Sequence, residues 1–296
     1  MSASSTEARS ISVTPLGEAL GAEINGVDFK QPLTESVLAE INEAWAKHLV
    51  LRFRGLQDLS PEDLIDFSKN FGTLDARPIA TGDRSAYLEV DRPELTIISN
   101  VIIDGKPIGG LGAYEADWHA DMTYVERPPK GSCLYAVEIP PAGGRTYFAN
   151  MYLAYDTLDH ETKQKIENLT CIHDASRNSA GQLRNGYEEI NDPRRTIGPS
   201  HPLVRIHPTT GRKCLLLGRR RNAYINGLDL EESEALLDKL WGHATQLQFT
   251  WGQEWKLGDM IMWDNRCTMH YREAFDPSSR RIMFRTQISG EPVVGA

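Results

Sequence analysis

The stretch GDMIMWDNRCTMHYREAFD, residues 258–276, decides the fold class because it predicts a turn, a short strand and a polar segment in close succession. Gly258 and Asp259 form the turn, Met260 to Trp263 form the strand, and His270 follows the polar segment. Similar short β-segments occur elsewhere: GSCLYAVEIP (131–140), RTYFAN (145–150), LQFTW (247–251) and RRIMFRTQIS (280–289). Short strands separated by turns favour a sandwich or barrel over a parallel α/β sheet.

Four stretches predict helices that cover this β-core. They are LTESVLAEINEAWAKHL (33–49), SPEDLIDFSKNFG (60–72), residues 151–168 and DLEESEALLDKLWGHAT (229–245). The second has a complete start signal, with Ser60 at the N-cap, Pro61 at the first helical position and Asp63 where a capping box needs an acid. We therefore predict a mainly β protein with flanking helices.

The chain is expected to form one domain over residues 1–296, with a flexible N-terminus at about 1–10. Between these residues and the C-terminal strands, a segment at about 75–115 is rich in Gly, Pro and Asp and contains one predicted strand, LTIIS (95–99). Loops of this length are usually functional or disordered. We interpret this segment as a lid over the active site.

Composition excludes several classes of protein. A formal net charge of −9 repels phosphate backbones and argues against nucleic acid as a partner. The basic run GRRRN (218–222) is the local exception, and a solvated surface is its simplest interpretation. Four cysteines without a CxxC pair, an N-terminus without an apolar h-region and no run of about 18 apolar residues predict a cytoplasmic protein without a membrane segment.

The stretch YEADWHADMTY (114–124) carries a histidine and an aspartate two positions apart. Side chains at i and i+2 of a strand share a face, so His119 and Asp121 can approach one metal ion together. The pair alone is a weak signal, which chance or a structural hydrogen bond also explains. With His270 as the third ligand, the set matches the facial triad of non-haem Fe(II) oxygenases, which leaves coordination positions open.

Two arginines in the last predicted strand form a candidate anion site. Arg281 and Arg285 fall on one face of RRIMFR and Arg280 falls on the other. Their Cα atoms should lie roughly 13 Å apart, so one guanidinium per anion is the economical interpretation. The alternative is a pair of solvated arginines on an edge strand.

Seven segments together resemble the Fe(II)/2-oxoglutarate-dependent dioxygenases of the taurine dioxygenase and 2,4-dichlorophenoxyacetate dioxygenase (TauD/TfdA) family. They are LGAEINGVDF, LVLRFRG, FSKNFG, WHADMTY, PPAGGRTYFANM, HPLVRIHPTTGRKCLLL and GDMIMWDNRCTMHYREAF…RRIMFR, in the family's order from about residue 11 to 291. W-H-x-D-x-T, followed by W-D-N-R-x-x-x-H and an arginine eleven positions later, is a highly specific combination.

The resemblance implies a double-stranded β-helix (jelly-roll, cupin-like) core and an oxidoreductase that uses Fe(II), 2-oxoglutarate and O2. By motif position, three residues would hold the iron: His119, Asp121 and His270. Arg281 and Thr146 would bind the distal carboxylate of 2-oxoglutarate, and Arg285 would hold the keto-acid end or the anionic head of the substrate. The reaction would be hydroxylation of a C–H bond with release of succinate and CO2.

The expected substrate is a small organic anion: an aryloxyalkanoate, sulfonate, alkyl sulfate or carboxylate. Arg77 stands where taurine dioxygenases carry a histidine, and Glu115 stands where they carry an asparagine, so taurine itself is not expected. The predicted substrate contacts are Arg77, Glu115, Met122 and Arg285. Arg77 as an ordinary surface arginine stays open, and Arg219 to Arg221 add a candidate anion contact.

A second class of function also stays open: a cupin-like metal-binding protein or a zinc hydrolase without oxygenase activity. The arginine pair and Thr146 favour the dioxygenase, because a hydrolase needs no keto-acid site. Resemblance further implies a homo-oligomer, either a dimer or a tetramer.

Overall fold

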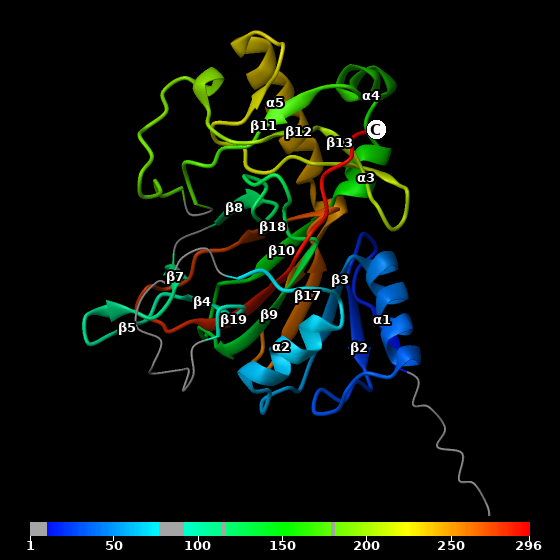
Figure 1. The fold of residues 1–296 in the computed structure, drawn as a ribbon, viewed down its shortest axis with the longest axis vertical. Coiled ribbons are helices and arrows are strands. Elements are labelled where there is room, and N and C mark those ends of the chain that lie inside the picture. Colours follow the sequence, from blue (N-terminus) through cyan, green and yellow to red (C-terminus); the bar gives the residue numbers. More distant parts are fainter. Residues whose placement is uncertain (1–10, 77–91, 114–115, 179–180) are drawn as a thin grey trace, which may run out of the picture.

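The computed structural model describes residues 11–76, 92–113, 116–178 and 181–296, which form two main β-sheets with helices outside them (Figure 1). The expected flexible N-terminus and residues 77–91 of the expected lid lie outside the described residues. In the described ranges, no helix is both long and apolar enough to cross a membrane.

The larger sheet has eight strands and is mostly antiparallel. In order across the sheet they are β1 (Ser12–Pro15), β2 (Ala22–Asn25), β3 (Val50–Phe53), β17 (Met260–Asp264), β9 (Gly131–Glu138), β19 (Ile282–Ile288), β4 (Thr96–Ser99) and β7 (Gly110–Leu111). Only the β2–β3 and β4–β7 pairs within it are parallel among the described strands. The first half of the chain and the C-terminal strands therefore meet in one sheet.

The smaller main sheet has four antiparallel strands. In order they are β16 (Thr250–Gln253), β10 (Thr146–Asn150), β18 (Thr268–Arg272) and β8 (Ala116–His119). Alternate residues of β17 point to opposite faces of the larger sheet, and both sets are buried. Ile261 and Trp263 belong to a core cluster with Phe148 of β10, so the smaller sheet packs on this face.

The other face of the larger sheet is covered by α1 (Glu35–His48) and α2 (Pro61–Lys69). Met260 and Met262 of β17 belong to a second core cluster with Trp45 of α1 and Phe67 of α2. The capping box at Ser60, predicted from the sequence, is present at the start of α2.

Three further helices and several short strands lie at the end of the molecule away from α2, at the top of Figure 1. The helices are α3 (Met151–Asp156), α4 (His160–Ile166) and α5 (Leu230–Ala244), with 3₁₀ turns η1 (Pro193–Arg195) and η2 (Leu247–Phe249). The strands are β11 (Thr170–Ile172), β12 (Ser200–Pro202), β13 (Val204–Ile206), β14 (Lys213–Leu215) and β15 (Tyr224–Ile225). They form the sheets β12-β11-β15 and β13-β14.

Several expected boundaries differ from the structure. The single helix expected at 151–168 is two helices, because Asp159 caps a new start by accepting the N–H of Thr162 at 2.7 Å. Residues 247–249 form η2 and not a strand. The described part of the expected lid holds β4, β7 and the hairpin of β5 (Ile102–Ile103) with β6 (Lys106–Pro107), where one strand was predicted.

Replacing Ser60 by alanine should lower the free energy of unfolding by about 1 kcal/mol. The N–H of Asp63 donates to Ser60 Oγ at 3.1 Å, and the N–H of Ser60 donates to Asp63 Oδ2 at 2.9 Å. The variant loses the first of these bonds. Urea denaturation followed by circular dichroism measures the change. Ser36→Ala on the exposed side of α1 is the matched control, and equal stability of the two variants would contradict the prediction.

Candidate active site

Two histidines face each other across neighbouring strands. β18 pairs with β8 so that His270 lies opposite His119, and the two ring centroids are 4.2 Å apart. The Nδ1–H of His119 donates to the carbonyl of Asp117 at 2.6 Å. The lone pair of this ring is therefore on Nε2, which is the arrangement that a metal ligand needs.

β8 contains a β-bulge between the two positions that pair with β18. His270 and Arg272 of β18 are two residues apart, but the residues of β8 that pair with them, His119 and Ala116, are three residues apart. Residues three apart in a regular strand face opposite ways, but the extra residue lets Ala116 and His119 line the same pocket. The bulge thus aims the histidine at the site.

Asp121 approaches the histidines from a turn and not from a strand. β8 ends at His119, and Asp121 begins a turn in which Met122 has a φ of +51°. Asn265 holds this turn: its Oδ1 accepts the N–H of Asp121 at 2.7 Å, and its Nδ2 donates to the carbonyls of Asp121 and Pro129, both at 2.9 Å. His119 and Asp121 are therefore close together, but the prediction that they share one face of a strand is wrong.

The three side chains form a compact group. One ligand atom from each of His119, Asp121 and His270 lies within 4.8 Å of the others, and Asp121 Oδ1 is 3.7 Å and 3.9 Å from the respective Nε2 atoms. Burial would raise the pKa of Asp121, but Arg285 and the two imidazoles outweigh it and hold this pKa well below its usual range. Burial, and then His119, lowers the pKa of His270 to about 3. A carboxylate and neutral imidazoles are the forms that bind a divalent metal.

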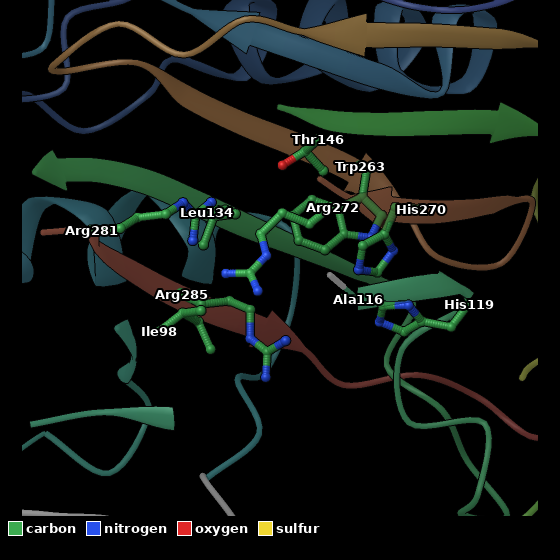
Figure 2. Close-up of a pocket in the computed structure, with 10 residues that line it drawn as sticks. All are labelled: Ile98, Ala116, His119, Leu134, Thr146, Trp263, His270, Arg272, Arg281 and Arg285. Atoms are coloured by element: carbon green, nitrogen blue, oxygen red, sulfur yellow. The ribbon is translucent and has the colours of Figure 1, made fainter. Parts of the chain in front are cut away.

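A pocket extends from these histidines between the two main sheets (Figure 2). Its lining residues are Ile98, Ala116, His119, Leu134, Thr146, Trp263, His270, Arg272, Arg281 and Arg285. Arg281 lies at the end away from the histidines and is 2% exposed, yet its guanidinium has no hydrogen bond or ion pair within the described part of the chain. Burial, and then Arg272, lowers the pKa of Arg281 to about 9. A buried cation without a partner is costly, so this end of the pocket is suited to an anion.

Thr146 lies beside this cationic end, opposite Arg272 in the β10–β18 pair. The indole N–H of Trp255 donates to Thr146 Oγ1 at 3.1 Å. Because this bond uses the oxygen as an acceptor, the O–H of Thr146 remains available as a donor. Thr146 can therefore bind the same anion as Arg281.

Arg285 lies closer to the candidate metal ligands. Its Nη1 is 3.3 Å from Asp121 Oδ2. Arg281 and Arg285 both line the pocket, so they share the face that the strand alternation predicted. Arg280 faces away and forms an ion pair with Glu138 at 2.7 Å.

The other predicted substrate contacts are less well defined. Arg77 and Glu115 lie outside the described residues. Met122 is half-buried in the turn that follows Asp121. The three arginines of the basic run 218–222 have different surroundings. Arg220 and Arg221 pair with surface acids, while Arg219 lies beside His119.

Sequence reasoning missed three residues that build the site: Arg272, Asn265 and Trp255. Arg272 follows His270 by two residues, so strand alternation points to it once residues 268–272 are known to form a strand. Asn265 and Trp255 act through hydrogen bonds to Asp121 and Thr146. The spacing of residues along the chain carries no signal for these contacts.

Comparison with known proteins gives a consistent result along the whole chain. Residues 12–287 match the family described as taurine catabolism dioxygenase TauD, TfdA family. The 2,4-dichlorophenoxyacetate dioxygenase of Cupriavidus pinatubonensis, which is α-ketoglutarate-dependent, is 34% identical over 96% of this chain and 100% of its own length. The (S)-phenoxypropionate/α-ketoglutarate-dioxygenase of Delftia acidovorans is 35% identical over 95% of this chain and 96% of its own.

Sulfate esters appear among the relatives as well. The α-ketoglutarate-dependent sulfate ester dioxygenase of Pseudomonas putida is 31% identical over 99% of this chain and 94% of its own. Among solved structures, AAD-2 in complex with Mn(II) and N-oxalylglycine is similar with a TM-score of 0.78 and 34% identity, over 97% of this chain and 100% of that one.

Replacing Asn265 by alanine should weaken binding of Mn(II) about 10-fold to 100-fold, because the loss of three hydrogen bonds frees the turn that carries Asp121. Calorimetric titration of the metal-free protein measures the affinity, and the thermal midpoint checks folding. Asn226→Ala, which removes side-chain bonds in a remote sheet, is the matched control. A folded Asn265→Ala variant with the wild-type affinity would rule out the positioning role.

Proposed function

The chain belongs to the taurine catabolism dioxygenase TauD/TfdA family and is a 2-oxoglutarate-dependent non-haem iron dioxygenase, and we propose that it hydroxylates a C–H bond of a small organic anion. Succinate and CO2 are the co-products. The observation that carries this proposal is the buried guanidinium of Arg281, which shares one pocket with a group of two histidines and a carboxylate.

The residues of the site fit both iron and 2-oxoglutarate. His119, Asp121 and His270 offer two imidazole nitrogens and one carboxylate oxygen, a donor set typical of non-haem Fe(II) with open coordination positions. Arg281 and Thr146 are suited to the distal carboxylate of 2-oxoglutarate, since Arg281 supplies a cation that no described residue pairs with and Thr146 supplies an O–H donor.

Bound iron, with 2-oxoglutarate and O2, supplies the oxidation of an unactivated C–H bond, which no side chain can perform. The protein supplies geometry and charge. Arg281 orients the cosubstrate from the far end of the pocket, and Trp255 orients the hydroxyl of Thr146. Arg285 lies against Asp121 and helps to keep this carboxylate ionised. The apolar walls at Leu134 and Trp263 help to exclude water.

The proposed substrates are aryloxyalkanoates, alkyl sulfates, sulfonates and carboxylates. The named relatives act on 2,4-dichlorophenoxyacetate, (S)-phenoxypropionate and sulfate esters, all of which are anions. Arg77, Glu115, Met122 and Arg285 are the proposed substrate contacts, with residues of the 75–115 segment acting as a lid.

We further propose that the two main sheets form a double-stranded β-helix within one domain over residues 1–296. The pocket between an eight-stranded and a four-stranded sheet supports this arrangement. A homo-oligomer, dimer or tetramer, is proposed from the family resemblance. A cytoplasmic location is proposed because the four cysteines are free and buried.

Replacing Arg281 by methionine should weaken 2-oxoglutarate binding at least about 10-fold, because the variant loses a charge-assisted contact at a buried site. The visible charge-transfer band of the anaerobic Fe(II)–2-oxoglutarate complex measures this binding. Arg280→Met removes a neighbouring arginine on the outer face and is the matched control. An unchanged titration in Arg281→Met would show that the cosubstrate binds elsewhere.

A screen of succinate release should identify the substrate. Aryloxyalkanoates, alkyl sulfates, sulfonates and amino acids are compared with the background rate without substrate, and at least one anion is expected to stimulate turnover well above it. Asp121→Ala should abolish this stimulation because it removes a metal ligand. If no anion raises succinate release over the background, the proposed substrate class is wrong.

A further inference from the structure

A second group of arginines, which have no acidic partner among the described residues, lies near the candidate metal ligands. The guanidinium carbon of Arg184 is 3.6 Å from the ring centroid of Tyr124, and that of Arg219 is 5.5 Å from the same centroid. Tyr124 follows Asp121 by three residues and belongs to the same turn. Two guanidinium groups thus share one aromatic ring next to the candidate metal ligands.

The arginines of this region separate into two kinds. Arg177 and Arg221 both pair with Glu189, and Arg220 pairs with two acids of α5. Arg184 and Arg219 form no ion pair with any described residue. The only hydrogen bond from the Arg219 side chain within the described ranges is from Nη1 to the carbonyl of Arg177 at 2.9 Å, and its buried Nε has no partner.

Backbone contacts place Arg219 beside the metal ligands. Arg219 forms an isolated antiparallel bridge with His119, and the N–H of Ala120 donates to the carbonyl of Gly218 at 3.2 Å. An anion held at Arg219 would therefore lie close to the candidate metal ligand His119.

Among the described residues, no acid forms an ion pair with Arg184 or Arg219. The carboxylates of Asp121 and Asp174 act on the charge of Arg219 without pairing with it. Asp121 belongs to the candidate metal centre and is paired with Arg285, while Asp174 accepts hydrogen bonds from the N–H of Ser176 and the side chain of Asn222. Burial, and then the charge of Arg184, lowers the pKa of Arg219 to about 10.

Arg285, the other arginine near the metal ligands, already uses both of its amino groups. One of its amino groups is 3.3 Å from Asp121, and the other donates to Gln287 Oε1 at 3.4 Å. Arg281 is separated from the substrate side by the cosubstrate that it is proposed to hold. Within the described residues, the buried Nε atoms of Arg219 and Arg285 have no hydrogen-bond partner, and Arg184 contacts the ring of Tyr124.

We propose that Arg219 and Arg184, held against Tyr124, bind the oxyanion head of the primary substrate: a carboxylate, sulfonate or sulfate. This inference rests on the proposed function and names the part of the site that selects anionic substrates. The two guanidinium groups donate to the oxyanion, and its charge relieves their mutual repulsion. The remainder of the substrate then extends toward the iron.

Calorimetry on the protein loaded with Mn(II) and N-oxalylglycine, the pair bound by a structural relative, tests this site while the cosubstrate position is filled. The probes are hexyl sulfate, hexanesulfonate, 2,4-dichlorophenoxyacetate and inorganic sulfate, with hexanol as the uncharged comparison. Arg219→Met should weaken binding of the anions about 10-fold or more, and Arg184→Met should weaken it by a smaller factor. Neither change should affect hexanol.

Arg221→Met is the matched control, because Arg221 belongs to the same basic run but is exposed and paired with Glu189. Its affinities should equal those of the wild type. A folded Arg219→Met variant that binds the anions as well as the wild type overturns the proposal, and so does failure of all four anions to bind the loaded wild-type protein.

A second measurement does not depend on a folded variant. Phenylglyoxal should modify Arg219 and Arg184 in the loaded wild-type protein, and hexyl sulfate should protect both, as read by mass spectrometry of the peptides. Modification that hexyl sulfate does not reduce overturns the proposal. If the wild type fails to load with Mn(II) and N-oxalylglycine but hexyl sulfate still protects Arg219, the proposed function fails while this anion site stands.

Discussion

The register between β8 and β18 is the constraint on which the rest of the site depends. It places His119 opposite His270, and a slip of one residue would turn one imidazole to the other face of the sheet. The bulge in β8 adds a second condition, since it lets Ala116 and His119 face the same pocket. Asp121 then joins the histidines only because Asn265, at the end of β17, binds the backbone of its turn. Three separate parts of the chain must therefore pair correctly before one metal site exists.

The site contains the carboxylate of Asp121 and two groups of arginines. Asp121 is kept ionised by Arg285 and the imidazoles, although it is buried. Arg281 and Arg272 line the far end of the pocket, and Arg219 and Arg184 lie near the metal ligands. Isolated buried cations are unfavourable, so a protein that keeps several of them close together gains stability when anions bind. The chain has a net charge of −9, so this local excess of positive charge is opposite in sign to the overall balance.

Much of the site could be predicted from the sequence, but partly for a mistaken reason. His119, Asp121 and His270 come together, and Arg281 and Arg285 share a face of β19, as the patterns indicated. The strand argument for Asp121 fails because β8 ends two residues earlier. The start of α2 was predicted from its local cap at Ser60. The start of α4 was missed, although Asp159 caps it in a similar way. The extra strands between residues 102 and 111 pair within their own segment, β5 with β6 and β7 with β4, and only the predicted strand β4 pairs with the distant β19.

Local patterns and composition were enough to predict the class of the protein: a mainly β chain with capped helices, a dioxygenase motif in the expected order and no excess positive charge. These features depend on alternation, spacing and composition, which act along the chain. The folded chain was needed to show which arginines have no acidic partner among the described residues, which residues orient the ligands and which arginines of the run 218–222 face acids. The physical reason is that charge compensation and hydrogen bonding are short-range in space. The partners of Arg219, Asn265 and Thr146 are set by contacts between segments that lie far apart in sequence.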